Sequence, residues 1–73
     1  MGKAAGSDIR LKMNIERVGT DTRTGLPVYE FEYKANPGER FRGVMAHEVE
    51  AKYPDAVTTG PDGFKAVFYE RLG

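Results

Sequence analysis

The chain has no cysteine, no tryptophan and a single histidine among its 73 residues. Without cysteine there are no disulfides or thiolate metal sites, and one histidine argues against a transition-metal centre. Eleven basic and eleven acidic residues cancel and are interspersed, so the basic excess typical of nucleic-acid binders is missing. No apolar run is long enough to predict a membrane span or a signal peptide. We therefore expect no cofactor, no metal, no nucleic acid and no membrane partner.

The length also limits how the chain can be stabilised. A domain of this size buries only about 60% of its unfolded surface and is marginally stable alone. Because cysteine is absent and a metal site is not expected, either oligomerisation or an unusually well packed core has to supply the stability. Residues 1–6, MGKAAG, lack an apolar pattern and are expected to be a linker or the stub of an upstream region. We expect one domain over residues 7–73.

Alternating apolar and polar residues predict strands in the first half of the chain. Leu11, Met13 and Ile15 alternate with polar residues, and this pattern predicts a half-buried strand with Lys12 on the opposite, solvent-facing side. The alternation returns over residues 28–34 as VYEFEYK.

Glycine and proline mark the loops of this half. GTDTRTGLP, residues 19–27, predicts a turn-rich loop, and the Asn-Pro-Gly of ANPGER, residues 35–40, predicts a turn. Residues 28–34 and 41–45 would then form a hairpin.

The apolar period changes in the second half. Met45, Val49 and Tyr53 are four apart, which predicts a short amphipathic helix over about residues 47–53, ended by Pro54. Pro-Asp-Gly at 61–63 then predicts the turn of a second hairpin, with strands over residues 56–58 and 64–68. The expected class is α+β, a small single domain of short antiparallel strands and hairpins with one short helix.

Four segments appear in an order and spacing that carry a resemblance: SDIRLKMNI, GLPVYEFEYK, FRGVMAHEVEAKYPDAV and DGFKAVFYERL. Together they resemble the short form of the peptidase S74 domain, the C-terminal intramolecular chaperone domain of phage tail fibres, tailspikes and endosialidases. The likeness extends from Ser7 to Leu72. Two positions depart from the family pattern, since His47 stands where glutamine is common and Phe68 where aspartate is common.

The resemblance implies a function and a set of site residues. Members of the family promote folding and trimerisation of the fibre segment ahead of them, and many then cut themselves free. Carried over, Ser7 is the nucleophile, Lys12 the base and Gly6–Ser7 the cleaved bond. Supporting roles are expected for Asp8, Arg10, Asn14 and His47.

The resemblance also implies partners and a setting. The expected partners are two further copies of the chain in a homotrimer and an upstream fibre or tailspike segment of the same polypeptide. The chain would be made as a tail fibre precursor in the cytoplasm of a bacterial host, then released after cleavage or retained on the virion.

The chemistry of a serine–lysine pair sets a geometric condition. Serine needs a base, and lysine serves only if its pKa falls by about three from its ordinary 10.4. Five residues of strand span about 16 Å, too far for a hydrogen bond. Residues 8–10 must therefore form a turn that folds Ser7 back, or the two groups must meet across chains. Asp8 suits such a turn because its carboxylate can accept backbone N–H bonds from residues just ahead.

Less specific interpretations stay open beside this one. On spacing alone, a Ser-Asp pair before a strand is usually a turn or helix cap. The domain could also be an assembly module that trimerises without cutting, or a small monomeric binding domain that uses its aromatic strand. His47 is expected to be mainly a polar helix residue, with a supporting role in the site as the alternative.

The aromatic residues are expected in the core or at a subunit interface rather than in a ligand site. These are Tyr29, Phe31, Tyr33, Phe64 and Tyr69. The trimer interface is expected to include some of Met13, Ile15, Tyr29, Phe31, Val49 and Phe68.

Overall fold

The computed structural model describes residues 5–72, which form two antiparallel three-stranded sheets, one α-helix and three single-turn 3-10 helices. The strands are β1 Ala5–Gly6, β2 Lys12–Thr20, β3 Pro27–Tyr33, β4 Asn36–Gly43, β5 Val57–Thr59 and β6 Lys65–Val67. The helices are α1 Ala46–Lys52 and the 3-10 turns η1 Ile9–Leu11, η2 Pro54–Ala56 and η3 Tyr69–Arg71. The α+β class is thus confirmed.

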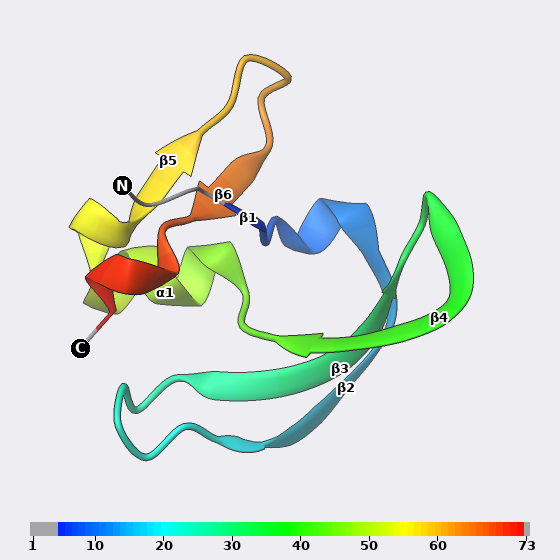
Figure 1. The fold of residues 1–73 in the computed structure, drawn as a ribbon, viewed down its shortest axis with the longest axis horizontal. Coiled ribbons are helices and arrows are strands. Elements are labelled where there is room, and N and C mark those ends of the chain that lie inside the picture. Colours follow the sequence, from blue (N-terminus) through cyan, green and yellow to red (C-terminus); the bar gives the residue numbers. More distant parts are fainter. Residues whose placement is uncertain (1–4, 73) are drawn as a thin grey trace.

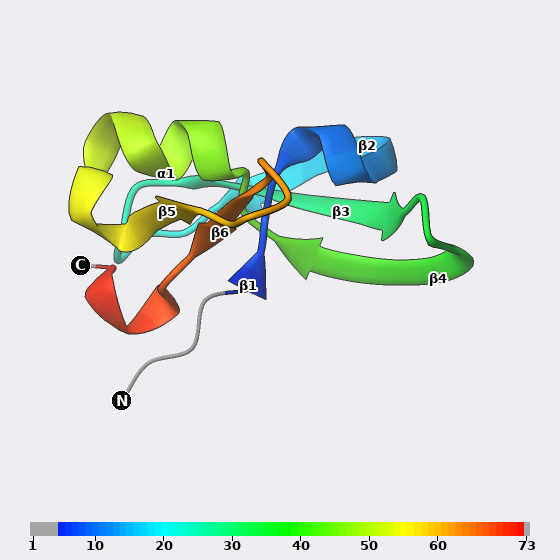
Figure 2. The same cartoon turned by 90° about the horizontal axis from the view of Figure 1, so that it is seen from above.

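The two sheets lie on either side of the helix in the view of Figure 1. The larger sheet has the order β2-β3-β4 and the smaller one the order β1-β6-β5. Helix α1 contacts β5 and β6, and Figure 2 shows it on one side of that pair. The first strand of the chain therefore pairs with its last strand, with Gly6 opposite Ala66. Of the expected linker, Ala5 and Gly6 form this strand and residues 1–4 lie outside the described residues.

The helix and the second hairpin lie where the sequence predicts them. Helix α1 ends at Lys52, one residue before the expected end, because Pro54 disfavours a helical conformation of Tyr53. Its buried residues are Ala46 and Val49. The turn between β5 and β6 contains Gly63 at a φ of 83°, a conformation that glycine adopts without strain.

The turn predicted over all of ANPGER is shorter in the structure, so that prediction was wrong in extent. Only Lys34 and Ala35 form the turn, and β4 begins at Asn36, opposite Tyr33. Pro37 lies on the outer strand of the sheet, where the missing N–H removes no ladder hydrogen bond from an inner strand. The pairing of β3 with β4 has a register shift between Phe31 and Tyr33, and this shift accommodates the irregular start of β4.

The predicted alternation at the start of β2 is also wrong. Lys12 is buried at 3% exposure, whereas Ile15 is exposed at 37%. The expected strand is interrupted twice. Leu11 belongs to the 3-10 turn η1, so the alternation begins only at Lys12, and a β-bulge lies between Met13 and Glu16, where Asn14 adopts a φ of 52°. Lys12 lies before the bulge and directly after the 3-10 turn, so the turn and not the bulge sets the face that its side chain occupies.

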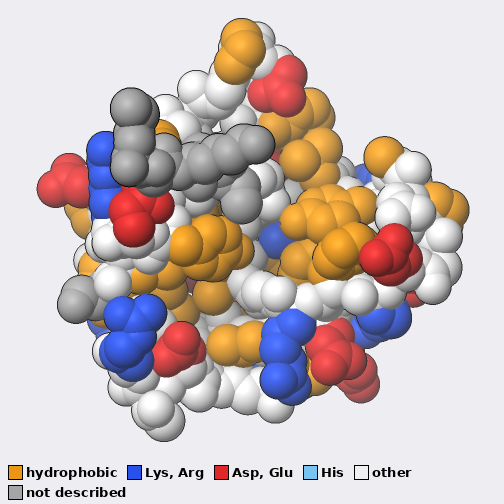
Figure 3. Space-filling view, in the orientation of Figure 1, with side chains coloured by type: hydrophobic (Ala, Val, Ile, Leu, Met, Phe, Trp, Pro, Cys, Tyr) orange, Lys and Arg blue, Asp and Glu red, His pale blue; other side chains and the backbone are white. Residues whose placement is uncertain are grey.

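The main hydrophobic core lies around helix α1. Its buried members are Leu26, Val44, Ala46, Val49, Ala56, Val67 and Leu72. Because Phe31 and Val49 are also buried within the domain, these two members of the expected trimer interface are not available to a partner, while Ile15 is. Figure 3 shows hydrophobic side chains gathered over the middle of one face. None of the helices in residues 5–72 has the length and apolar character needed to span a bilayer.

Replacing Leu26 with alanine should lower the free energy of unfolding by about 2–4 kcal/mol, because Leu26 is 2% exposed and its removal leaves a cavity. Urea unfolding followed by circular dichroism measures the change. Ile15→Ala is the control, and its effect should stay within about 0.5 kcal/mol because Ile15 is partly in solvent. Equal losses for the two variants would contradict the burial of Leu26 and the exposure of Ile15.

Candidate active site

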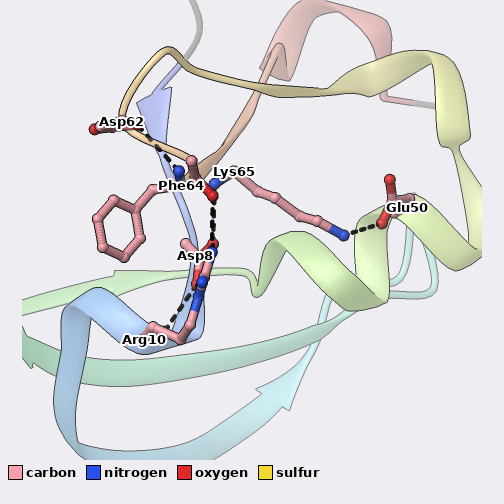
Figure 4. A network of polar contacts seen from close by, with 7 residues as sticks. Asp8, Arg10, Glu50, Asp62, Phe64 and Lys65 are labelled. Carbon is pink, nitrogen blue, oxygen red and sulfur yellow. Dashed lines mark hydrogen bonds and ion pairs between the residues drawn. The ribbon is translucent and has the colours of Figure 1, made fainter.

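Asp8 holds the turn that separates Ser7 from Lys12. It caps the 3-10 turn η1, and its Oδ1 accepts hydrogen bonds from the Arg10 backbone N at 2.9 Å and Nε at 3.0 Å. Its Oδ2 accepts from Arg10 Nη2 at 2.8 Å and from the Lys65 backbone N at 2.9 Å (Figure 4). The Arg10 guanidinium keeps the pKa of Asp8 well below its usual range, although burial opposes the effect. The predicted role of Asp8 as a turn former is confirmed, and Arg10 acts as its partner.

Ser7 is held by segments from three parts of the chain. Its backbone N donates to Lys65 O on β6 at 3.2 Å, and its carbonyl accepts from Ala46 N at the start of α1 at 2.8 Å. Its Oγ lies 3.3 Å from the Tyr69 hydroxyl on η3. The residue is 1% exposed, so the hydroxyl lies in a fixed and mostly dry position.

Lys12 carries an ammonium group into the protein interior. Its Nζ donates to Val44 O at 2.9 Å and contacts Met45 Sδ at 3.7 Å, and it lies 4.0 Å from the centre of the Phe31 ring. Within residues 5–72, Lys12 forms no ion pair with a carboxylate. Burial lowers the pKa of Lys12 to about 8, while the charge of Asp8 acts weakly in the opposite direction. About a tenth of such a lysine is neutral at pH 7.

Ser7 and Lys12 both form hydrogen bonds to the short connection between β4 and α1. Lys12 binds the carbonyl of Val44, and Ser7 binds the N–H of Ala46, two residues further on. Among the described residues, however, no hydrogen bond joins Ser7 Oγ to Lys12 Nζ, and the partner of Oγ is Tyr69. The turn at residues 9–11 thus replaces an extended path and brings both residues to one buried region.

The other two expected supporting residues lie differently. Asn14 is exposed in the bulge of β2, and its side-chain amide donates to Glu32 Oε2 at 3.1 Å, away from both Ser7 and Lys12. His47 is exposed on α1 and lines a shallow surface hollow of about 330 Å³, which Asp8 and Arg10 also line. Neither side chain contacts the serine hydroxyl or the lysine amine.

Within the described part of the chain, histidine and carboxylate side chains do not gather in any group of three that could hold an ion. The chemistry that the region offers is proton transfer between a hydroxyl and a partly neutral amine.

Comparison with known families decides the identity of the domain. The sequence model of the peptidase S74 family, described as a chaperone of endosialidase, matches residues 7–58. The chain belongs to the peptidase S74 family. Neither the curated proteins nor the solved structures contain a match to it. The match to the S74 family begins at Ser7, the residue that follows the expected cleavage point.

Two tyrosines that were expected in the core or at a subunit interface contact Gly6 and Ser7 instead. Tyr33 on β3 donates its hydroxyl hydrogen to the Gly6 carbonyl at 2.9 Å, and Tyr69 contacts Ser7 as described. They are 27 and 62 residues away from these partners, so no local spacing could reveal the contacts. Tyr69 also lies beyond the S74 match.

Replacing Lys12 with methionine should stabilise the domain, because methionine has a similar shape without the buried charge. The pKa of Lys12 is lowered in the folded state, so above about pH 8 and below the ordinary lysine pKa the unfolded chain binds more protons. In that window the free energy of unfolding of the natural chain should rise with pH by about 3 kcal/mol through this group. At pH 7 the variant should be more stable by about 1–2 kcal/mol, since the lost bond to Val44 offsets part of the gain.

Urea unfolding at several pH values checks both effects. Lys34→Met is the control, because Lys34 is exposed and its removal should leave the pH dependence unchanged. A Lys12→Met variant with the same pH slope as the natural chain would contradict the lowered pKa.

Proposed function

We propose that this S74 domain is a C-terminal intramolecular chaperone that promotes folding and trimerisation of an upstream phage tail fibre or tailspike segment. It then releases itself by cutting Gly6–Ser7 with Ser7 as nucleophile and Lys12 as base. The setting of this single event is a fibre precursor in the cytoplasm of a bacterial host. The family's description as a chaperone supports the first part, and the state of Lys12 supports the second.

The single observation that carries the cleavage proposal is the buried amine of Lys12. A lysine can act as a general base only when it is neutral, and desolvation supplies that condition near physiological pH. Burial of a lysine without a carboxylate is costly for stability, so its presence indicates a functional demand. The buried hydroxyl of Ser7 at the same β4–α1 connection is the group that this base would serve.

The proposed step transfers the acyl group of Gly6 from the Ser7 nitrogen to Ser7 Oγ. Neutral Lys12 takes the proton of Ser7 Oγ as the oxygen attacks the Gly6 carbonyl carbon, and the C–N bond then breaks as Lys12 returns the proton to the Ser7 nitrogen. If the attacked bond is in the same chain, the product is an ester between Gly6 and Ser7 Oγ. Water hydrolyses that ester to a carboxylate on Gly6 and a free hydroxyl and amine on Ser7. Gly6 is exposed, which gives water access to the ester.

The catalytic contact requires Lys12 to approach Ser7 Oγ. A neutral amine has a lone pair and two N–H groups, so it can accept from Ser7 while it still donates to Val44. Hydrogen bonds of this kind often shorten only in the reacting complex. The present hydrogen bond between Ser7 Oγ and the Tyr69 hydroxyl instead favours the second candidate, an S74 assembly module that trimerises without cutting.

Cleavage can be tested by fusing the chain behind an upstream trimeric fibre segment and following the appearance of a fragment that begins with Ser7. Ser7→Ala and Lys12→Met should abolish it, and Lys12→Arg should not restore it because arginine stays protonated. Ser7→Ala should still fold, since water can replace the lost hydroxyl at Tyr69, which is 44% exposed. Added hydroxylamine should convert part of the Gly6 terminus to a hydroxamate by trapping the ester.

The rate should depend on pH through Lys12. Below about pH 8 it should rise about tenfold per pH unit, and above that value it should level off as the amine becomes fully neutral. A trimeric fusion that stays intact at pH 9 would support the assembly module and contradict the cleavage. A flat pH profile would contradict Lys12 as the base.

Trimerisation is a separate prediction. Sedimentation at tens of micromolar should detect a trimer of the chain, and Ile15→Glu should weaken it because a charge would enter an exposed apolar position on β2. Glu16→Gln on the same strand is the control and should leave assembly unchanged. A natural chain that sediments only as a monomer would contradict self-association of the isolated domain.

A further inference from the structure

Both polar groups of the peptide bond between Gly6 and Ser7 form hydrogen bonds, one on each side of the bond. Its N–H donates to Lys65 O on β6 of the smaller sheet, and its carbonyl oxygen accepts from the Tyr33 hydroxyl on β3 of the larger sheet. The N–H and C=O of a trans peptide point in opposite directions, so these two bonds fix the orientation of the whole amide. Gly6 O consequently faces Tyr33 and not the neighbouring strand of its own sheet.

We propose that Tyr33 is a further catalytic residue, whose hydroxyl stabilises the negative charge that develops on Gly6 O when the bond is attacked. This inference rests on the cleavage proposed above. The Tyr33 hydroxyl donates to Gly6 O at 2.9 Å before the reaction, so the donor already lies at the atom on which the negative charge develops. As the carbonyl becomes an oxyanion, the hydrogen bond becomes charge-assisted and stronger, so it lowers the energy of the transition state more than that of the ground state.

The ring of Tyr33 is held in place before the reaction. It makes edge-to-face contacts with Phe31, with ring centres 5.3 Å apart, and with Phe41, at 5.1 Å. A donor that is already oriented costs no rearrangement as the charge forms, which is the source of its catalytic effect.

The Tyr33 hydroxyl stays protonated in the pH range in which the Lys12 amine loses its proton. Burial, and to a smaller extent Tyr69, raises the pKa of Tyr33 above its usual value, whereas burial lowers that of Lys12 to about 8. At pH 8–9 the site therefore holds a neutral base and a protonated donor together. Lys12 Nζ lies 6.0 Å from the centre of the Tyr33 ring, so the two groups face one region.

The test compares Tyr33→Phe with Tyr29→Phe in the trimeric fusion described above. Tyr29 is a matched control on the same strand, since its hydroxyl also donates to a protein oxygen, Glu48 Oε2 at 3.0 Å, but not at the cleaved bond. Tyr33→Phe should lower the maximal cleavage rate about 100-fold. We expect the lower end of the usual range because Gly6 is exposed and water can replace part of the donor's effect. Tyr29→Phe should cleave within about threefold of the natural chain.

Three measurements separate the outcomes. Thermal unfolding identifies conditions in which all variants are folded, and rates are compared there. The pH midpoint of the Tyr33→Phe profile should stay near that of the natural fusion while the plateau falls. An unchanged plateau would overturn the inference and leave the cleavage standing, and a loss caused by a shifted midpoint would show that Tyr33 acts through Lys12 instead. If the natural fusion does not cut at all, the proposed cleavage fails and this inference fails with it.

Discussion

The carboxylate of Asp8 is the constraint on which the site depends. A buried carboxylate must be surrounded by donors, and Asp8 finds them in Arg10 beside it and in the Lys65 backbone of β6. These bonds close the turn at residues 9–11 and fasten it to the last strand of the chain. Because of them, Ser7 and Lys12 leave the extended path and approach the same connection between β4 and α1.

Lys12 illustrates a conflict between stability and chemistry. The amine is buried against Phe31 and Met45, where an apolar side chain would be more stable. The same burial lowers its pKa to about 8, so part of the amine is neutral near pH 7, as the proposed role of Lys12 as a base requires. In the proposed self-cleavage, the fold would have to form before Lys12 could act as a base. The coupling of folding to reactivity would delay any cut until the chaperone has assembled.

The elements with strong local signals were predictable. Helix α1 and the second hairpin were located within one or two residues, because Pro54 and Pro-Asp-Gly define their ends through local sterics. The start of β2 was not predictable in this way, because Leu11 belongs to a 3-10 turn instead of the strand and a bulge follows at Asn14, and no rule of alternation anticipates either. The turn explains why a lysine that the pattern assigned to solvent is buried, because Lys12 follows the turn directly and lies before the bulge.

By itself, the sequence determined the class of the fold, the turn-forming role of Asp8 and the family to which the chain belongs. These depend on spacings of a few residues and on an ordered set of motifs, both of which can be recognised without coordinates. Only the tertiary structure decided the protonation tendency of Lys12 and the presence of Tyr33 and Tyr69 at the Gly6–Ser7 bond. Desolvation is a property of everything that packs around a group, and the two tyrosines reach the bond from strand β3 and turn η3, which only folding brings next to it.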